Sequence, residues 1–352
     1  MRSIREAVDY LRQYDGPVIR LMEVCGTHTA QIAESGIPAM LSERIRLISG
    51  PGCPVCVTVT AFIDRLIDLA RTEGVTVLTF GDLMRVPGSA ESLADAKSTG
   101  ASVDFVYAPA EILARAQAQP DRRFVFAAIG FETTAPVYAM LMEEAIERGV
   151  KNVRLLTSLK TMPKAISRVA GMAAQAGRPL DGFLAPGHVC AVVGMSDYER
   201  LAGQLSLPFV ISGFQGPELV ASIYALVKMR GQAAVRNLYP SVVQKEGNEK
   251  ARAAIDRFFT PCDAGWRGMG VIPDSGLRIR EEYASFDAGS ERLTEDRAPE
   301  GCRCGEVLTG SIAPPECPFF GGGCTPGHPH GACMVSPEGS CHTWFNNNPR
   351  TP

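Results

Sequence analysis

The chain has 352 residues and a net charge of −3, and these properties exclude several classes of protein. Its 35 basic and 38 acidic residues leave no positive excess for binding nucleic acid or an anionic membrane. No apolar stretch approaches the ~18 residues of a transmembrane helix, and the N-terminus carries charges of both signs instead of an apolar signal core. We therefore expect a cytoplasmic protein whose 11 cysteines serve as metal ligands or redox groups.

The first predicted element is an amphipathic helix within residues 1–14, which we expect to pack on the rest of the chain. Short apolar runs then alternate with helix-patterned stretches, and this alternation predicts parallel strands covered by helices on both faces. The predicted strands are residues 17–24, 44–49, 75–80, 103–107, 123–129, 153–157, 182–185 and 208–211. The predicted helices between them include residues 61–71, 89–97, 136–148, 163–176 and 217–229.

So many strands exceed what one small sheet holds, and the most loop-like stretch between them is residues 116–121. The predicted fold is therefore α/β, with two doubly wound parallel-sheet lobes that face a cleft. We place the first lobe at residues 15–120 and the second at residues 121–232. Residues 233–352 form a C-terminal domain in which the periodicity fades.

A C-x-x-C motif, Cys53 and Cys56, lies where a predicted strand passes into a helix. The free N–H groups and the dipole at a helix start favour thiolate over thiol, so at least one of these cysteines should have a depressed pKa. Such a thiolate attacks disulfides or binds soft metals. The alternative is a pair of buried cysteines that act as small apolar side chains in a tight turn.

Other polar residues also follow predicted strands, and the carboxyl ends of parallel strands are where ligands bind. Cys25 is a candidate nucleophile or metal ligand, and the alternative is an inert core thiol. His28 either assists Cys25 or is only a residue at the start of a helix. Glu132 is either a helix cap or a general base, and His188 has the same ambiguity. Cys190 we interpret as structural. None of these loops carries a phosphate-binding or dinucleotide-binding pattern.

The tail concentrates the remaining cysteine chemistry. Cys317, Cys324, Cys333 and Cys341 are set among glycines and prolines in a segment with too little apolar content to fold without a metal centre. Their spacing of six to eight intervening residues favours an iron–sulfur cluster over zinc, which usually takes closely paired knuckles. A Cys302-x-Cys304 pair precedes them.

Several of these motifs, in this order, resemble the HypD family of hydrogenase maturation proteins. They are Cys25-Gly26-Thr27-His28, Gly50-Pro51-Gly52-Cys53-Pro54-Val55-Cys56, Gly130-Phe131-Glu132-Thr133-Thr134, Pro186-Gly187-His188 and Cys302-Arg303-Cys304-Gly305-Glu306-Val307-Leu308.

The resemblance implies a monomer of two α/β lobes and a third, iron–sulfur domain. It also implies a scaffold that builds the Fe(CN)2CO group of [NiFe] hydrogenases together with a HypC-type chaperone and a HypE-type cyanide donor. The residue that holds iron would be Cys25, and the redox pair would be Cys53 and Cys56. The [4Fe-4S] ligands would be Cys317, Cys324, Cys333 and Cys341, while Cys302 and Cys304 match a family motif.

These roles describe an assembly scaffold with an auxiliary thiol redox step rather than a turnover enzyme. Cys53, Cys56, His28, Glu132 and His188 are its predicted catalytic residues, and the iron of Fe(CN)2CO is bound only transiently. Two other classes use parts of the same sequence: a ferredoxin-linked disulfide reductase, which does not need Cys25 or His28, and a zinc-stabilised interaction module without redox chemistry.

Overall fold

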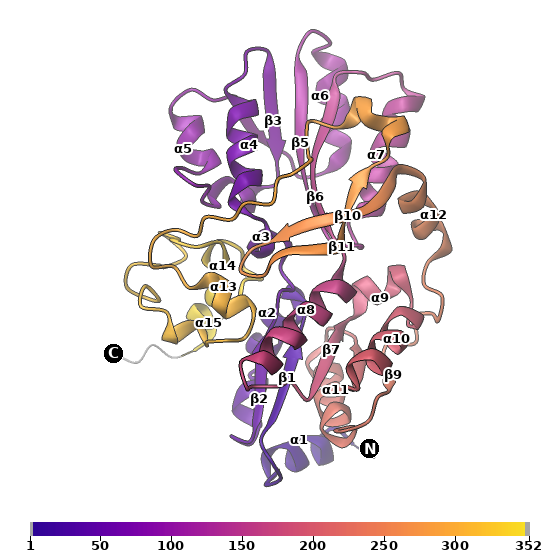
Figure 1. The fold of residues 1–352 in the computed structure, drawn as a ribbon, viewed down its shortest axis with the longest axis vertical. Coiled ribbons are helices and arrows are strands. Elements are labelled where there is room, and N and C mark those ends of the chain that lie inside the picture. The colour runs from indigo at the N-terminus through magenta and orange to yellow at the C-terminus, as the bar shows by residue number, and fades with distance from the viewer. Residues whose placement is uncertain (1–2, 349–352) are drawn as a thin grey trace.

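The computed structural model describes residues 3–348 and contains two mostly parallel sheets with helices packed on them (Figure 1). In the first sheet all neighbouring strands are parallel. Its strands, in spatial order, are β2 (Ile45–Ser49), β1 (Ile19–Glu23), β7 (Gly182–Pro186), β8 (Phe209–Ser212) and β9 (Val235–Asn237).

The second sheet is parallel over four strands and ends in an antiparallel hairpin. Its central strands β3 and β5 are buried almost throughout, as expected of strands covered on both faces. In spatial order the strands are β10 (Phe259–Trp266), β11 (Gly270–Ile279), β6 (Val153–Lys160), β5 (Arg123–Gly130), β3 (Val75–Thr79) and β4 (Val103–Phe105).

Most of the long helices connect consecutive strands, and several carry proline in the first turn, where its missing N–H removes no helical hydrogen bond. The helices up to β7 are α1 (Ile4–Arg12), α2 (Gly26–Glu34), α3 (Pro54–Val57), α4 (Thr60–Ala70), α5 (Leu93–Ser98), α6 (Pro109–Ala118), α7 (Ala135–Glu147) and α8 (Met162–Gln175). Those after β7 are α9 (Gly187–Val193), α10 (Ser196–Leu205), α11 (Gly216–Lys228), α12 (Glu249–Phe258), α13 (Cys304–Leu308), α14 (Ala332–Val335) and α15 (Ser340–Asn347).

The structure confirms the α/β class, the N-terminal helix and all eight predicted strands. The predicted assignment of these strands to contiguous lobes is wrong, because β3 and β4 join β5 and β6, whereas β1 and β2 join β7 and β8. The stretch 116–121 links α6 to β5 within one sheet. The chain instead crosses between the sheets after β2, after β6 and after β9, so each lobe is assembled from separate segments.

The β10–β11 hairpin was not predicted. It is rich in glycine and contains prolines, which weaken a strand pattern, and it forms because β11 pairs with β6 at the open side of the second sheet. Its tip carries Arg267, whose guanidinium is buried and donates to the carbonyl of Thr58, just after α3. The hairpin thus fixes the position of the C-x-x-C segment.

The C-terminal tail packs beside α2 and α3, at the level where the two lobes meet (Figure 1). Its helices α13, α14 and α15 are short and are joined by irregular chain rich in glycine and proline. The irregular form of this segment agrees with the prediction, whereas its iron–sulfur cluster stays a prediction. In the described residues, no helix combines the length and apolarity needed to cross a membrane.

Candidate thiol and metal site

The Cys25 loop and the C-x-x-C loop lie side by side. They leave the neighbouring parallel strands β1 and β2 at the same edge of the sheet. The N–H of Gly26 donates to the carbonyl of Gly52 over 3.0 Å. A side chain at position 52 would overlap the backbone of Cys25, so glycine is needed there for the two loops to approach. Two thiol-bearing loops, whose cysteines Cys25 and Cys53 are 28 positions apart in the sequence, are therefore in direct contact.

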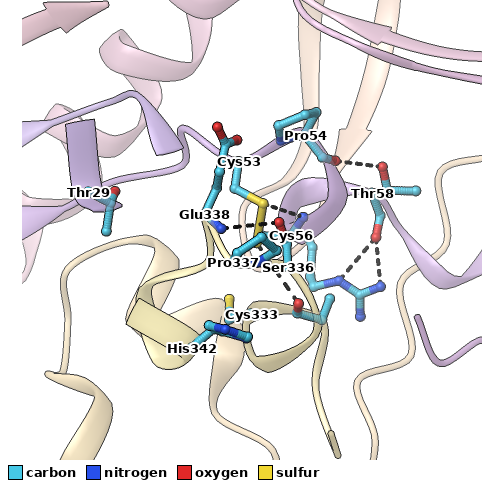
Figure 2. Close-up of a disulfide and its surroundings, with 12 residues drawn as sticks. Thr29, Cys53, Pro54, Cys56, Thr58, Cys333, Ser336, Pro337, Glu338 and His342 are labelled. Carbon is cyan, nitrogen blue, oxygen red and sulfur yellow. Dashed lines mark hydrogen bonds between the residues drawn. A yellow bond between two sulfur atoms is a disulfide. The ribbon is translucent and has the colours of Figure 1, made fainter. Parts of the chain in front are cut away.

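Cys53 and Cys56 form a disulfide at the start of α3 (Figure 2). Cys53 is the N-cap residue, and its sulfur accepts the N–H of Cys56 over 3.2 Å. Both side chains are buried, and their Cα atoms are 5.2 Å apart. This Cα separation lies in the usual range for a disulfide, and the redox role of the pair stays a prediction. The expected low pKa of one thiol concerns the reduced pair and stays a prediction.

The tail also touches this disulfide. The sulfur of Cys56 is 4.0 Å from the carbonyl oxygen of Ala332, the first residue of α14, and Cys333 is next in the chain. Figure 2 shows Cys333 and the turn from Ser336 to Glu338 beside the disulfide. The C-x-x-C segment is thus in contact with both the Cys25 loop and the cysteine-rich tail.

All six tail cysteines line one small cavity of about 20 Å³, together with Phe319, Phe320 and Met334. The sulfur atoms of Cys304 and Cys333 are 2.8 Å apart. Among residues 3–348, no group of three or more His, Cys, Asp or Glu side chains is arranged so that it could hold a metal ion as it stands. The convergence of sulfur ligands on an apolar cavity fits a thiolate-bound cluster, which remains a prediction. The four predicted ligands, Cys317, Cys324, Cys333 and Cys341, line this cavity together with Cys302 and Cys304.

Comparisons with known proteins show which family the chain is similar to. The model of the family HypD, described as "Hydrogenase formation hypA family", matches residues 1–348. The hydrogenase maturation factor HypD of Azotobacter vinelandii is 42% identical, covering 97% of this chain and 91% of that protein. The HypD of Escherichia coli K12 is 39% identical, covering 98% and 93%. A putative hydrogenase expression/formation protein of Methanocaldococcus jannaschii is 37% identical, covering 97% and 96%.

The chain belongs to the HypD family. It is therefore a hydrogenase maturation factor, as its motifs predicted. The roles that the resemblance gave to single residues of this HypD-family chain are compared with its geometry below.

Two carboxylates that were not predicted from the sequence lie near Cys25. Glu23 is buried and accepts the N–H of Cys25 over 2.9 Å, and Glu338 of the tail accepts the hydroxyl of Thr27 over 2.8 Å. Burial, and to a smaller extent the charges of Glu23 and Glu338, raises the pKa of Cys25 to about 12. At neutral pH the free thiol is therefore protonated, and a metal ion bound there must displace the proton.

A signal for one of these carboxylates is present in the sequence. Glu23 is a charged residue at the end of a mostly apolar strand, two positions before Cys25, which marks it as a candidate buried group with a partner. Burial raises its pKa to about 7. Glu338 has no comparable signal, because only the folded tail brings it to the first lobe.

His28 and His188 are held by the same aromatic ring. The centroid of Phe214 is 4.7 Å from the His28 ring and 3.9 Å from the His188 ring. His28 is fully buried and its Nε2 donates to the carbonyl of Gly213 over 3.0 Å. Burial lowers its pKa to about 4, so it is neutral near pH 7. His188 is exposed. The catalytic roles of both remain predictions.

Glu132 caps a helix, but not the helix that follows it. It is buried, and its Oε1 accepts the N–H of Met162, the first residue of α8, over 2.8 Å. Its Oε2 has no hydrogen-bond partner. The carboxyl group thus stabilises the segment where the chain crosses from one sheet to the other, and the proposed base role stays a prediction.

The burial of Glu132 predicts a pH-dependent stability. Burial raises its pKa from 4.5 to about 7, so the folded state favours the protonated form. The stabilisation is complete below pH 4.5 and is lost as the pH rises through 7. We expect Glu132→Gln to gain about 3 kcal/mol relative to the unchanged protein between pH 4.5 and pH 8. Urea unfolding across this range measures the difference, and a difference that does not vary with pH contradicts the assignment.

Proposed function

We propose that this chain is the scaffold on which the Fe(CN)2CO group of [NiFe] hydrogenases is assembled, in complex with a HypC-type chaperone. One observation carries the proposal: three thiol groups from distant parts of the chain adjoin one another. The Cys25 loop contacts the C-x-x-C loop, and the C-x-x-C disulfide contacts the segment that bears Cys333. Membership of the HypD family supports the same conclusion.

In this proposal the iron is the substrate, held by Cys25 and by a thiol of the chaperone. Low-spin iron that carries cyanide and carbonyl ligands is soft, and thiolates suit it. The helix start at Cys25 directs the N–H groups of Thr27 and His28 at the sulfur, which favours the thiolate once iron has displaced the proton. The chain works in a reducing cytoplasm and alone is a monomer.

The redox step uses the C-x-x-C pair in its dithiol form. Cyanide is delivered by a HypE-type partner as a protein thiocyanate. One cysteine thiolate attacks the thiocyanate sulfur, an S–S bond forms, and cyanide leaves with the electron pair of the broken S–C bond. The second cysteine displaces the partner thiol and closes the Cys53–Cys56 disulfide. The dithiol thus loses two electrons and two protons, and the products are the free partner thiol and hydrogen cyanide, which binds iron as cyanide.

The tail would hold a [4Fe-4S] cluster through Cys317, Cys324, Cys333 and Cys341, and such a cluster supplies electrons one at a time. The 2.8 Å approach of Cys304 to Cys333 supports a second ligand set. If those two sulfurs pair with each other, the ligands are Cys302, Cys317, Cys324 and Cys341.

Serine replacement of single tail cysteines distinguishes the two sets. We expect variants of Cys317, Cys324 and Cys341 to lose the visible absorbance of the cluster after anaerobic purification, because each removes one ligand in either set. Loss in Cys333→Ser with retention in Cys302→Ser supports the first set, and the reverse supports the second. Retention of the full spectrum in all six variants contradicts a tail cluster.

The proposed function itself is tested by complementation. A bacterial strain that lacks its own HypD-family protein and cannot mature its [NiFe] hydrogenase should regain hydrogenase activity when this chain is supplied with its partner proteins. Absence of activity despite soluble, iron-containing protein would count against the proposal.

A second candidate function is a ferredoxin-linked disulfide reductase. The contact between the disulfide and the tail favours it, because electrons need only a short path between them. Such a reductase does not need Cys25, so it should keep full disulfide-reducing activity in Cys25→Ala.

A further inference from the structure

A groove of about 510 Å³ runs along the outer edge of the first sheet. One wall is strand β2, which is the last strand of its sheet and, among the residues that the structure describes, has no strand paired to its outer side. The facing wall comes from the tail and includes Val307, Ile312 and Trp344. Trp344 is 39% exposed, which is unusual for a tryptophan and marks this surface as suited to a partner.

The open edge of β2 presents unpaired backbone groups to this groove. Four consecutive residues of the strand, 46–49, line it. The carbonyl of Arg44 and the N–H of Gly50 bond to β1. Because successive residues of a parallel strand turn their backbone groups to opposite sides, those of Leu47 and Ser49 point away from β1. An exposed edge of this kind pairs readily with an added strand.

One end of the groove is positively charged. Arg20, Arg46 and Arg178 all line it, and repulsion from Arg178 and Arg46 adds to burial in lowering the pKa of Arg20. The buried Nε of Arg20 has no hydrogen-bond partner. The carboxylate near them, Asp181, is already bonded to the N–H of Arg20 and to Arg230. The positive charge of the three arginines is therefore not fully neutralised by this carboxylate.

Two further carboxyl groups line the groove, and both are engaged elsewhere. Glu316 accepts the N–H of Ala313 over 2.6 Å, and Glu23 accepts the N–H of Cys25. The position of Glu23 also shows that the inner end of the groove lies beneath the Cys25 loop. A chain seated in the groove would therefore be anchored close to the proposed iron site.

From these features we infer that the groove binds an extended, acidic segment of the HypC-type chaperone, which adds a strand to β2 and places carboxylates on the three arginines. This inference rests on the proposed function, since it takes the chaperone as the partner. The apolar wall around Trp344 receives alternate side chains of the segment, and the backbone of Leu47 and Ser49 fixes its register.

Calorimetric titration of the purified chaperone into the full chain tests the inference. Arg46 and Arg178 are exposed, so the double variant Arg46→Glu/Arg178→Glu should fold normally. We expect it to bind at least about tenfold more weakly at low ionic strength, with the difference shrinking as salt is added. Leu47→Pro, which removes an outward N–H from an edge strand without touching the bonds to β1, should also weaken binding, whereas Leu47→Ala should weaken it less.

The matched control is Arg236→Glu, an exposed arginine on β9 at the opposite edge of the same sheet, which should bind as the unchanged protein does. A second readout is acrylamide quenching, which reports on Trp344 because the only other tryptophan, Trp266, is buried. Binding should protect Trp344. Unchanged affinity in both groove variants, with Trp344 still quenched, overturns the groove inference alone. Failure of the unchanged protein to bind the chaperone overturns the groove inference together with the partner in the proposed function.

Discussion

Replacing Cys53 or Cys56 with alanine is expected to reduce hydrogenase maturation to background. A single remaining thiol cannot close the disulfide that releases cyanide from a thiocyanate, so the two-electron step is lost rather than slowed. The visible spectrum of the tail should be retained, since neither cysteine is among its proposed ligands. Hydrogenase activity of complemented cells, measured beside the spectrum of the purified variant, checks both expectations.

The control for this experiment is Cys262→Ala. Cys262 is a free cysteine on β10, in the hairpin and not among the residues of the proposed site, so its loss should leave maturation unchanged. Normal maturation in Cys53→Ala or Cys56→Ala would show that the pair has no redox role and that its disulfide only braces the start of α3.

Replacing Cys25 with alanine is expected to remove the iron that carries cyanide and carbonyl ligands and to leave the iron of the tail cluster in place. Cys25 is the N-cap residue of α2 and is not among the residues that line the tail cavity. We therefore expect the complex of Cys25→Ala with the chaperone to lose the infrared bands of iron-bound cyanide and carbonyl, and hydrogenase maturation with them, but to keep the cluster absorbance.

Cys190→Ala is the matched comparison. Cys190 is buried in α9, and burial raises its pKa well above the usual value, which fits an inert thiol. Its removal should leave the infrared bands in place. If Cys25→Ala keeps these bands while Cys190→Ala loses them, then Cys190 and not Cys25 holds the iron.

The strands and long helices could be predicted from the sequence because burial on both faces of a parallel sheet produces continuous apolar runs, as in β3 and β5. The pairing of the strands could not be predicted from the sequence. Local periodicity does not reveal that the chain after β2 leaves its own sheet and returns only at β7, since this choice is made by contacts between distant segments. For the same reason, the expected lobe boundary near residue 120 was placed inside one lobe.

The cysteines of the candidate site could be predicted from the sequence, whereas its carboxylates could be predicted less well. Cys25, Cys53 and Cys56 stand in loops that parallel strands bring to one edge, so their approach follows from the strand order of β1 and β2. Glu338 reaches Cys25 only because the tail folds back over 311 residues of sequence to Thr27. Glu132 was expected to cap α7 or act as a base, and it caps α8 because the crossing after β6 brings that helix to it.

The most direct test of the account is metal and sulfide analysis, with a visible spectrum, of the full chain purified anaerobically together with its chaperone. We expect a brown complex with about four iron and four sulfide per chain in the tail, and about one additional iron that depends on Cys25. A colourless complex that contains zinc and no sulfide would contradict the account, since neither an electron-supplying tail nor an iron scaffold could then exist.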